Sequence, residues 1–145
     1  MLLKAYIVGL TDGEGSFTAY IRPPRRKEGA KNYRVECHYY VKLREDDLPL
    51  LQKVKQFFGV GRVSFQRDRR PNHHNCYRYE TTHLREIREV IIPFFNANVL
   101  QGNKIHDFQL FKKIVDAVTK KRHQTKSGLE QIERWKKKMH IFRAR

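Results

Sequence analysis

Two stretches of the chain carry apolar residues at every second position, in 16–22 and again in 34–43. The apolar positions are Phe17, Ala19 and Ile21 in the first stretch and Val35, Cys37, Tyr39, Val41 and Leu43 in the second. Because side chains alternate between the two faces of a β-strand, this period predicts two half-buried strands. Shorter alternations predict two more strands, at 62–66 with Val63 and Phe65 inward and at 76–80 with Tyr77 and Tyr79 inward.

The remaining segments have apolar residues three or four positions apart, which is the spacing of one face of an α-helix. The predicted helices cover residues 2–13, 48–58, 84–91, 104–119 and 129–140. Capping side chains are predicted at Asp46 or Asp47, at Thr82, and at Ser127, which forms a capping box with Glu130. Gly59 is predicted to end the second helix, and Pro93 is predicted to end or kink the third.

The order of these elements predicts an α+β fold. A helix, two strands, a helix, two strands and further helices form an αββαββα core, with one four-stranded antiparallel sheet and helices on one of its faces. The 145 residues fit one domain, 1–145, with a core of about 3–118 and a basic helical tail at 119–145. The other face of the sheet is then left without apolar cover and is predicted to bind a partner.

The charge of the chain indicates what that partner is. The 31 Lys and Arg residues outnumber the 15 Asp and Glu, and the net charge of +16 points to nucleic acid. A twisted strand pair can enter the DNA major groove, where Arg, Gln and Thr read base edges. The predicted DNA-binding residues of the sheet are Thr18, Tyr20, Arg22, Arg34, His38, Tyr40, Lys42, Arg62, Ser64, Gln66, Arg78 and Glu80, with Arg25, Arg26 and Arg67 in the loops.

Other classes of protein fit the sequence less well. The apolar run at 5–10 is too short for a signal peptide or a spanning helix, so we expect an intracellular protein that binds no membrane. Two cysteines, Cys37 and Cys76, do not make a disulfide framework of the secreted type, although the sequence leaves a single bridge between them open. The run His73-His74-Asn75-Cys76 lacks the spacing of a zinc site, and a loop that contacts DNA is the favoured interpretation.

The first predicted helix has two unusual features. Gly9 and Gly13 lie four residues apart, and each costs about 1 kcal/mol against alanine inside a helix, which is offset if a second helix approaches closely there. Asp12 and Glu14 place negative charge at the C-terminal end, at a cost of about 0.3–1 kcal/mol each. Mg²⁺ needs only one or two carboxylates besides water and phosphate oxygens, so this end is a candidate magnesium site.

The run Ile7 to Gly15, IVGLTDGEG, followed by Ser16-Phe17, resembles the LAGLIDADG motif of homing endonucleases at its Gly, Leu, Asp, acidic and final Gly positions. Residues 50–63 resemble the segment that follows the second strand in that family. With the order of elements, the resemblance covers about residues 3–118. It implies the LAGLIDADG fold and an enzyme, a homing endonuclease of the intron-encoded kind.

The resemblance also implies how such an enzyme would work. One motif per chain implies a homodimer whose first helices meet through Gly9, Leu10, Asp12 and Gly13. Glu14 would bind Mg²⁺ or Mn²⁺, with the Gly13 carbonyl as a further ligand, whereas Ca²⁺ would support binding without cleavage. Lys104 is the candidate basic catalytic residue. Leu43, flanked by Lys42 and Arg44, occupies the place of the family's usual Gln, so the water would be positioned by one of these two basic residues or by another group. The cuts would cross the minor groove of a long, nearly palindromic site and leave 3′ overhangs.

Three other functions remain open from the sequence. The same fold could serve as an RNA-splicing maturase or as a DNA-binding protein that does not cleave, and RNA is a partner only under the first of these. A small basic RNA-binding protein of ribosomal type would require neither a dimer nor a metal, and it leaves the spacing of Gly9 and Gly13 unexplained. The target site and the compartment, whether bacterial or archaeal cytoplasm or an organelle, are not encoded in these patterns.

Overall fold

The computed structural model describes residues 2–25, 29 and 32–141. Its main elements are α1 (Lys4–Glu14), β1 (Gly15–Arg22), β2 (Arg34–Arg44), α2 (Leu48–Phe58), β3 (Arg62–Gln66), β4 (Cys76–Thr81), α3 (Leu84–Glu86), α4 (Ile92–Ala97), α5 (Lys104–Thr119) and α6 (Lys126–Lys138). Short turns of other helix types, η2 (Glu45–Asp47), η3 (Ile87–Ile91) and η4 (Arg122–Gln124), join them. The predicted α+β fold and order of elements are confirmed.

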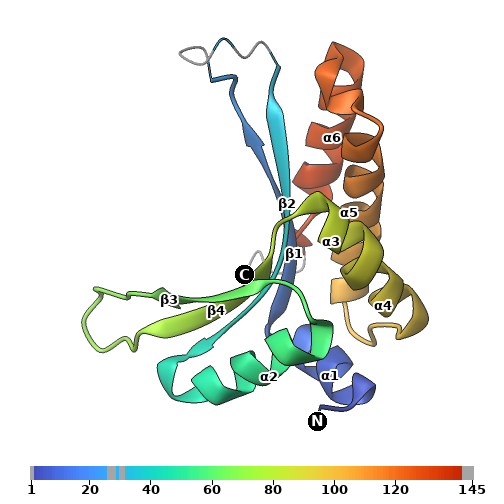
Figure 1. Cartoon of the computed structure of the whole chain (residues 1–145). Helices are drawn as coiled ribbons and strands as arrows, with labels where there is room; N and C mark the ends of the chain where they lie inside the picture. Colours follow the sequence, from blue (N-terminus) through green and yellow to red (C-terminus); the bar gives the residue numbers. More distant parts are fainter. Residues whose placement is uncertain (1, 26–28, 30–31, 142–145) are drawn as a thin grey trace.

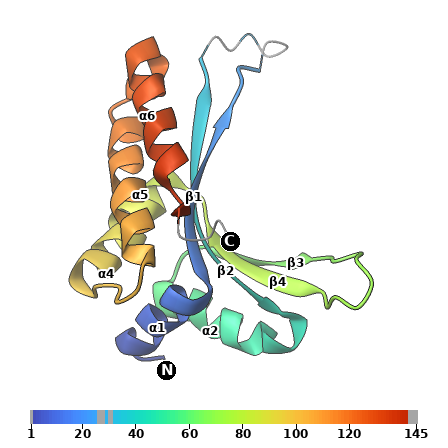
Figure 2. The ribbon, with the colours of Figure 1, turned by 180° about the vertical axis from the view of Figure 1, so that it is seen from behind.

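The four strands form one antiparallel sheet in the order β1-β2-β4-β3. The β1–β2 and β3–β4 hairpins diverge from each other, so the sheet is strongly curved (Figure 1). Figure 2 shows α5 and α6 beside the first hairpin and α1 and α2 below the sheet. The curved sheet thus leaves a long surface that these helices do not cover.

The core lies between the sheet and the helices, and aromatic rings fill its centre. The predicted inward residues Phe17 and Tyr39 are fully buried, and their rings stack with centroids 5.1 Å apart. Phe95 from α4 and Phe108 from α5 pack against Phe17 at 5.4 and 5.1 Å. The Tyr39 hydroxyl shares a buried 2.7 Å hydrogen bond with Thr11 Oγ1, which fixes α1 against the sheet.

Phe65 was predicted to point inward, but its side chain is 49% exposed. It lies near the end of β3, an edge strand, where the second hairpin extends beyond the helices (Figure 1). Its ring packs against Tyr77 of β4, with centroids 5.4 Å apart. An inward position in a strand is therefore buried only where a helix lies beneath it.

Several helix ends also differ from the predictions. Pro93 does not end the third helix, because the π turn Ile87–Ile91 comes directly before α4 and places Pro93 in its first turn, where a missing N–H is tolerated. Thr82 does not cap α3, because the residue at the N-cap position is His83, and its side chain makes no capping hydrogen bond. Asp47 stands at the N-cap position of α2, but its side chain makes no capping hydrogen bond either. Thr125, not Ser127, caps α6 by accepting the Gly128 N–H at 3.1 Å. Within the described residues, no helix is both long enough and apolar enough to span a membrane.

Candidate active site at the end of helix α1

A surface depression lies where α1 ends and β1 begins. It is lined by Gly13, Glu14, Gly15, Ser16, Tyr40, Lys42 and Lys104, which come from α1, β1, β2 and α5. The helix passes into the strand without a loop, because Glu14 ends α1 and Gly15 begins β1. The exposed Glu14 carboxylate is therefore at a fixed point at the start of the sheet.

Gly15 makes this direct connection between helix and strand possible. Its N–H donates to the Thr11 carbonyl oxygen, which closes the last helical turn. A Cβ atom at Gly15 would lie 2.8 Å from Thr11 Cγ2 and 2.9 Å from Thr11 Cα, closer than such contacts occur. The last Gly of the motif is thus required by the close approach of the helix backbone.

Asp12 and Lys104 fasten the end of α1 to the start of α5. The Asp12 carboxylate accepts the backbone N–H groups of Gln101 at 2.9 Å and Gly102 at 3.1 Å. In the opposite direction, Lys104 Nζ donates to the carbonyl oxygens of Thr11 at 3.1 Å and Asp12 at 3.4 Å. The Lys104 ammonium therefore lies at the negative end of the α1 dipole, beside the depression that holds Glu14.

Four residues of the depression are not among the residues predicted to be catalytic or to bind metal: Gly15, Ser16, Tyr40 and Lys42. Tyr40 was predicted only as a DNA contact, whereas Lys42 was predicted as a DNA contact and also, beside Leu43, as one of the basic residues that could position the water. Gly15 was predicted only as the last Gly of the motif, and Ser16, which pairs with Tyr40 across the sheet, was given no role. Strand alternation is the signal that finds Lys42, because it places Lys42 on the same face as Tyr40 and turns Leu43 toward the core. Lys42 thus lines the depression, directly beside Leu43, which stands where the family usually has Gln.

One side of α1 is uncovered in the described part of the chain. Leu3 is 74% exposed, Tyr6 is 48% exposed, and Gly9 and Gly13 are also exposed. A Cβ atom built on Gly9 or Gly13 would meet no described atom within 4 Å. Nothing in the described protomer requires these two glycines. Asp12, predicted at the same interface, is engaged within the protomer by Gln101 and Gly102.

The predicted DNA-facing residues of the sheet fall into two groups around buried or half-buried carboxylates. In the first hairpin, Glu36 contacts Arg22 at 3.4 Å, Arg34 at 3.6 Å and His38 at 3.4 Å. In the second, Glu80 contacts Arg62 at 2.8 Å and Arg78 at 3.7 Å. Burial lowers the pKa of His38 below its ordinary value, and the charges of Glu80 and Glu36 offset part of that shift.

The other predicted DNA contacts lie at the edges of this surface. Thr18 on β1 lies 3.3 Å from His140 Nε2 of the segment after α6, and Tyr20 has its ring 4.9 Å from that of His38. Gln66 Nε2 donates to Ser64 Oγ at 3.3 Å on β3. Arg25 and Arg67 are exposed at the two hairpin ends, and Arg26 lies outside the described residues.

The donor set at Glu14 fits a loosely held hard cation. Among the described residues, no group of three or more His, Cys, Asp or Glu side chains is arranged to hold a metal ion. Glu14 offers one carboxylate, and the last turn of a helix leaves carbonyl oxygens without partners inside the helix, including that of Gly13. Mg²⁺ takes its remaining ligands from water and substrate phosphates, so these donors suit it better than a closed structural metal site.

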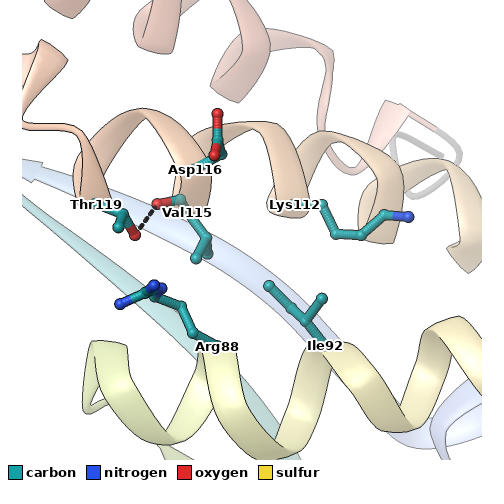
Figure 3. Close-up of a pocket in the computed structure, with 6 residues that line it drawn as sticks. All are labelled: Arg88, Ile92, Lys112, Val115, Asp116 and Thr119. Atoms are coloured by element: carbon teal, nitrogen blue, oxygen red, sulfur yellow. Dashed lines mark hydrogen bonds between the residues drawn. The ribbon is translucent and has the colours of Figure 1, made fainter.

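A second depression lies on the helical side, between α5 and the η3–α4 segment (Figure 3). It is lined by Arg88, Ile92, Lys112, Val115, Asp116 and Thr119. Three of its polar side chains have local partners: Thr119 Oγ1 donates to the Val115 carbonyl oxygen at 2.7 Å, Asp116 pairs with Lys120 at 3.0 Å, and Lys112 Nζ donates to Asn96 Oδ1 at 3.0 Å. We assign no function to this depression.

The chain belongs to the LAGLIDADG endonuclease family, whose model matches residues 7–115. Two curated relatives are "Probable intron-encoded endonuclease 2" and "Probable intron-encoded endonuclease 3" of Neurospora crassa. Each is 32% identical, over 133 and 134 residues, which are 90% and 92% of this chain. The chain spans only 28% and 24% of the length of these relatives.

Solved structures of the same family are similar over nearly the whole chain. The LAGLIDADG homing endonuclease I-LtrWI bound to target DNA has a TM-score of 0.83 and 30% identity, and the match covers 97% of this chain and 45% of that one. I-SmaMI bound to uncleaved DNA in the presence of calcium ions gives 0.83 and 29%, with the same coverage. The homing endonuclease I-TnaI gives 0.81 and 26%, covering 96% of this chain and 88% of that one.

Proposed function

We propose that this chain supplies one half of a site-specific double-strand DNA endonuclease of the homing type. One observation carries the proposal: the exposed Glu14 carboxylate shares a depression with Lys42 and Lys104 at the end of a helix whose glycine face is uncovered. The net charge of +16 and the uncovered sheet face fit a DNA duplex. The similar structures that hold DNA support the same partner.

The second half of the enzyme would be another copy of this chain. In a two-fold dimer, Gly9 and Gly13 of each α1 would face those of the other copy and allow the helix backbones to approach closely. This brings two Glu14 carboxylates together, one for each DNA strand.

In this proposal residues 1–145 form one domain, in which the family core is followed by the basic tail at 119–145. The match to 45% of I-SmaMI and 88% of I-TnaI fits such a half-site unit.

The residues of the depression would divide the chemistry of phosphodiester hydrolysis among them. Glu14, with the Gly13 carbonyl, would hold Mg²⁺ or Mn²⁺, which when bound lowers the pKa of a water and neutralises charge on the phosphate. Lys104 is held by the Thr11 and Asp12 carbonyls, so its ammonium can stabilise negative charge that develops on the phosphate. Lys42, on the β2 side of the depression, can orient the phosphate or the attacking water. We propose cuts across the minor groove that leave 3′ overhangs.

The experiment that tests this function is cleavage of a randomised duplex library by the purified protein, with the cut ends sequenced. We expect cuts with 3′ overhangs in one nearly two-fold symmetric sequence with Mg²⁺ or Mn²⁺, and binding without cutting with Ca²⁺. Selection of duplexes without cutting in any of the three ions would contradict the nuclease and favour a DNA-binding protein. Selection of no duplex at all would contradict a DNA partner, and RNA binding would then support the maturase.

The role of Glu14 is tested by the substitution Glu14→Gln. We expect loss of cleavage by at least about 100-fold, because the amide gives up the charge that holds the cation, while DNA binding in Ca²⁺-free buffer is retained. Glu130→Gln is the matched control, since Glu130 is an exposed carboxylate on α6 outside the depression. A Glu14→Gln variant that cleaves at the wild-type rate would remove Glu14 from the mechanism.

A further inference from the structure

Glu80 is a buried carboxylate in the middle of a basic surface. It lies on β4, a central strand, where it pairs with Tyr40 of β2 on one side and Arg62 of β3 on the other. The residue is only 7% exposed. A carboxylate on a surface that binds phosphates repels the ligand, so its place there requires an explanation.

Two arginines from this surface converge on Glu80. Arg62 donates to Glu80 Oε1 with Nε at 3.0 Å and with Nη2 at 2.8 Å. Arg78 Nε lies 3.7 Å from Oε2, and the Arg78 guanidinium lies over the Tyr40 ring, 3.5 Å from its centroid. Tyr40 in turn lines the depression that contains Glu14. Glu80 thus joins the second hairpin to the candidate active site.

Stability alone does not account for this arrangement. The Arg62 side chain is 72% exposed, and an ion pair with so exposed a partner contributes little to the stability of a fold. The contacts do, however, restrict the orientation of both guanidinium groups. Arg62 is held through the hydrogen bonds of Nε and Nη2 to Glu80, and Arg78 lies between the Glu80 carboxylate and the Tyr40 ring. With Nε and Nη2 bonded to Glu80, the Arg62 guanidinium still has its third nitrogen, Nη1, to donate to a ligand. Because the side chain is already ordered, it loses less rotamer freedom on binding than a mobile arginine would.

We propose that Glu80 is a positioning residue that orients Arg62 and Arg78 to read base pairs in the major groove. The negative charge of Glu80 lowers the overall affinity for DNA, whereas the fixed arginines increase the difference in affinity between the target and other sequences. The proposal rests on the DNA-binding function proposed above and adds a specificity role to a residue that first counted only as a DNA contact.

Glu36 provides a matched control on the same face of the sheet. It also contacts arginines, but at 3.4 and 3.6 Å, and its side chain is 35% exposed against 9% for Glu80. Glu36→Gln and Glu80→Gln remove the same charge from the DNA-facing surface. A difference between the two variants therefore reports orientation of the arginines and not the change in net charge.

The test measures binding in Ca²⁺ to the duplex that the wild type selects and to duplexes with single base pairs changed. For Glu80→Gln we expect discrimination at the few base pairs that Arg62 and Arg78 read to fall by about 10-fold, the size of one good guanidinium–base contact. Affinity for unrelated duplex should be equal or higher. Discrimination as sharp as in the wild type, or an equal loss in Glu36→Gln, would overturn the proposal.

A second variant keeps the test valid if Glu80→Gln fails to fold. Arg62→Lys keeps the charge at an exposed position but cannot donate two hydrogen bonds in a fixed plane. We expect it to lose discrimination at the same base pairs with the salt dependence of binding unchanged, and its effect should not add to that of Glu80→Gln. Full discrimination in Arg62→Lys would contradict the proposal. If the wild type itself selects no duplex, the proposed function fails instead.

Discussion

Asp12 and Lys104 illustrate how single residues set the geometry of the site. Asp12, at the end of α1, accepts hydrogen bonds from Gln101 and Gly102 in the turn before α5, and Lys104, at the start of α5, donates to carbonyl oxygens at the end of α1. The motif identifies Glu14 as a candidate from sequence alone. It does not show what Asp12 does, because its partners are about 90 residues away and are backbone N–H groups with no sequence signature.

The two cysteines should differ sharply in reactivity. Burial raises the pKa of the Cys37 thiol to about 12, whereas Cys76 is only half-buried. At pH 8 we expect iodoacetamide to modify Cys76 in the folded protein, because the thiolate is the reactive form and Cys37 has almost none. Peptide mass spectrometry locates the label, and denatured protein, in which both thiols react, is the control. Labelling of both at similar rates in the folded state would show that Cys37 is accessible.

At the scale of elements, alternation and helical spacing predicted the sheet and the long helices well, because buried faces such as that of Phe17 and Tyr39 leave a periodic trace. The exceptions are places where a neighbouring element decides. Phe65 is exposed because, in the described part of the chain, no helix lies beneath its end of the hairpin, and Pro93 is accommodated by a π turn that the residues before it do not signal. Strand parity alone placed Lys42 on the same face as Tyr40, which is where the structure has it.

The segment after α6 is fastened by one buried carboxylate, which gives a test of this element. Asp107 of α5, 5% exposed, accepts the His140 backbone N–H at 2.7 Å and lies 3.2 Å from His140 Nδ1. Asp107→Ala should lower the free energy of unfolding by about 1–3 kcal/mol, because it leaves a partly buried donor without its acceptor. Urea denaturation measures this, with the exposed Gln109→Ala on the same helix as control. Equal stability of the two variants would show that the contact contributes nothing.

At the scale of the whole molecule, the glycine face of α1 allows folding and assembly to be separated. Gly9→Ala meets no described neighbour within the protomer and improves helix propensity by about 1 kcal/mol, so the melting temperature of the monomer should stay equal or rise. In the proposed dimer, the added methyl group lies between two helix backbones, and dissociation should become at least about 10-fold easier. Analytical ultracentrifugation separates these effects, with exposed Gln52→Ala on α2 as control. A dimer dissociation constant equal to that of the wild type would show that Gly9 does not lie in the dimer interface.

The direct passage from α1 into β1 has a further consequence for how such an enzyme acquires new targets. A strand advances about 3.3 Å per residue, and stacked base pairs are about 3.4 Å apart. Side chains on one face of β1 therefore follow Glu14 at intervals close to two base pairs, at Thr18, Tyr20 and Arg22. Because no loop separates Glu14 from β1, an insertion could not be absorbed there, and in the proposed enzyme the distance between the cut and each base pair contacted by β1 would be fixed. In that enzyme, specificity along β1 would change by exchange of side chains, whereas an added or lost residue would turn the DNA-facing side chains beyond it toward the core.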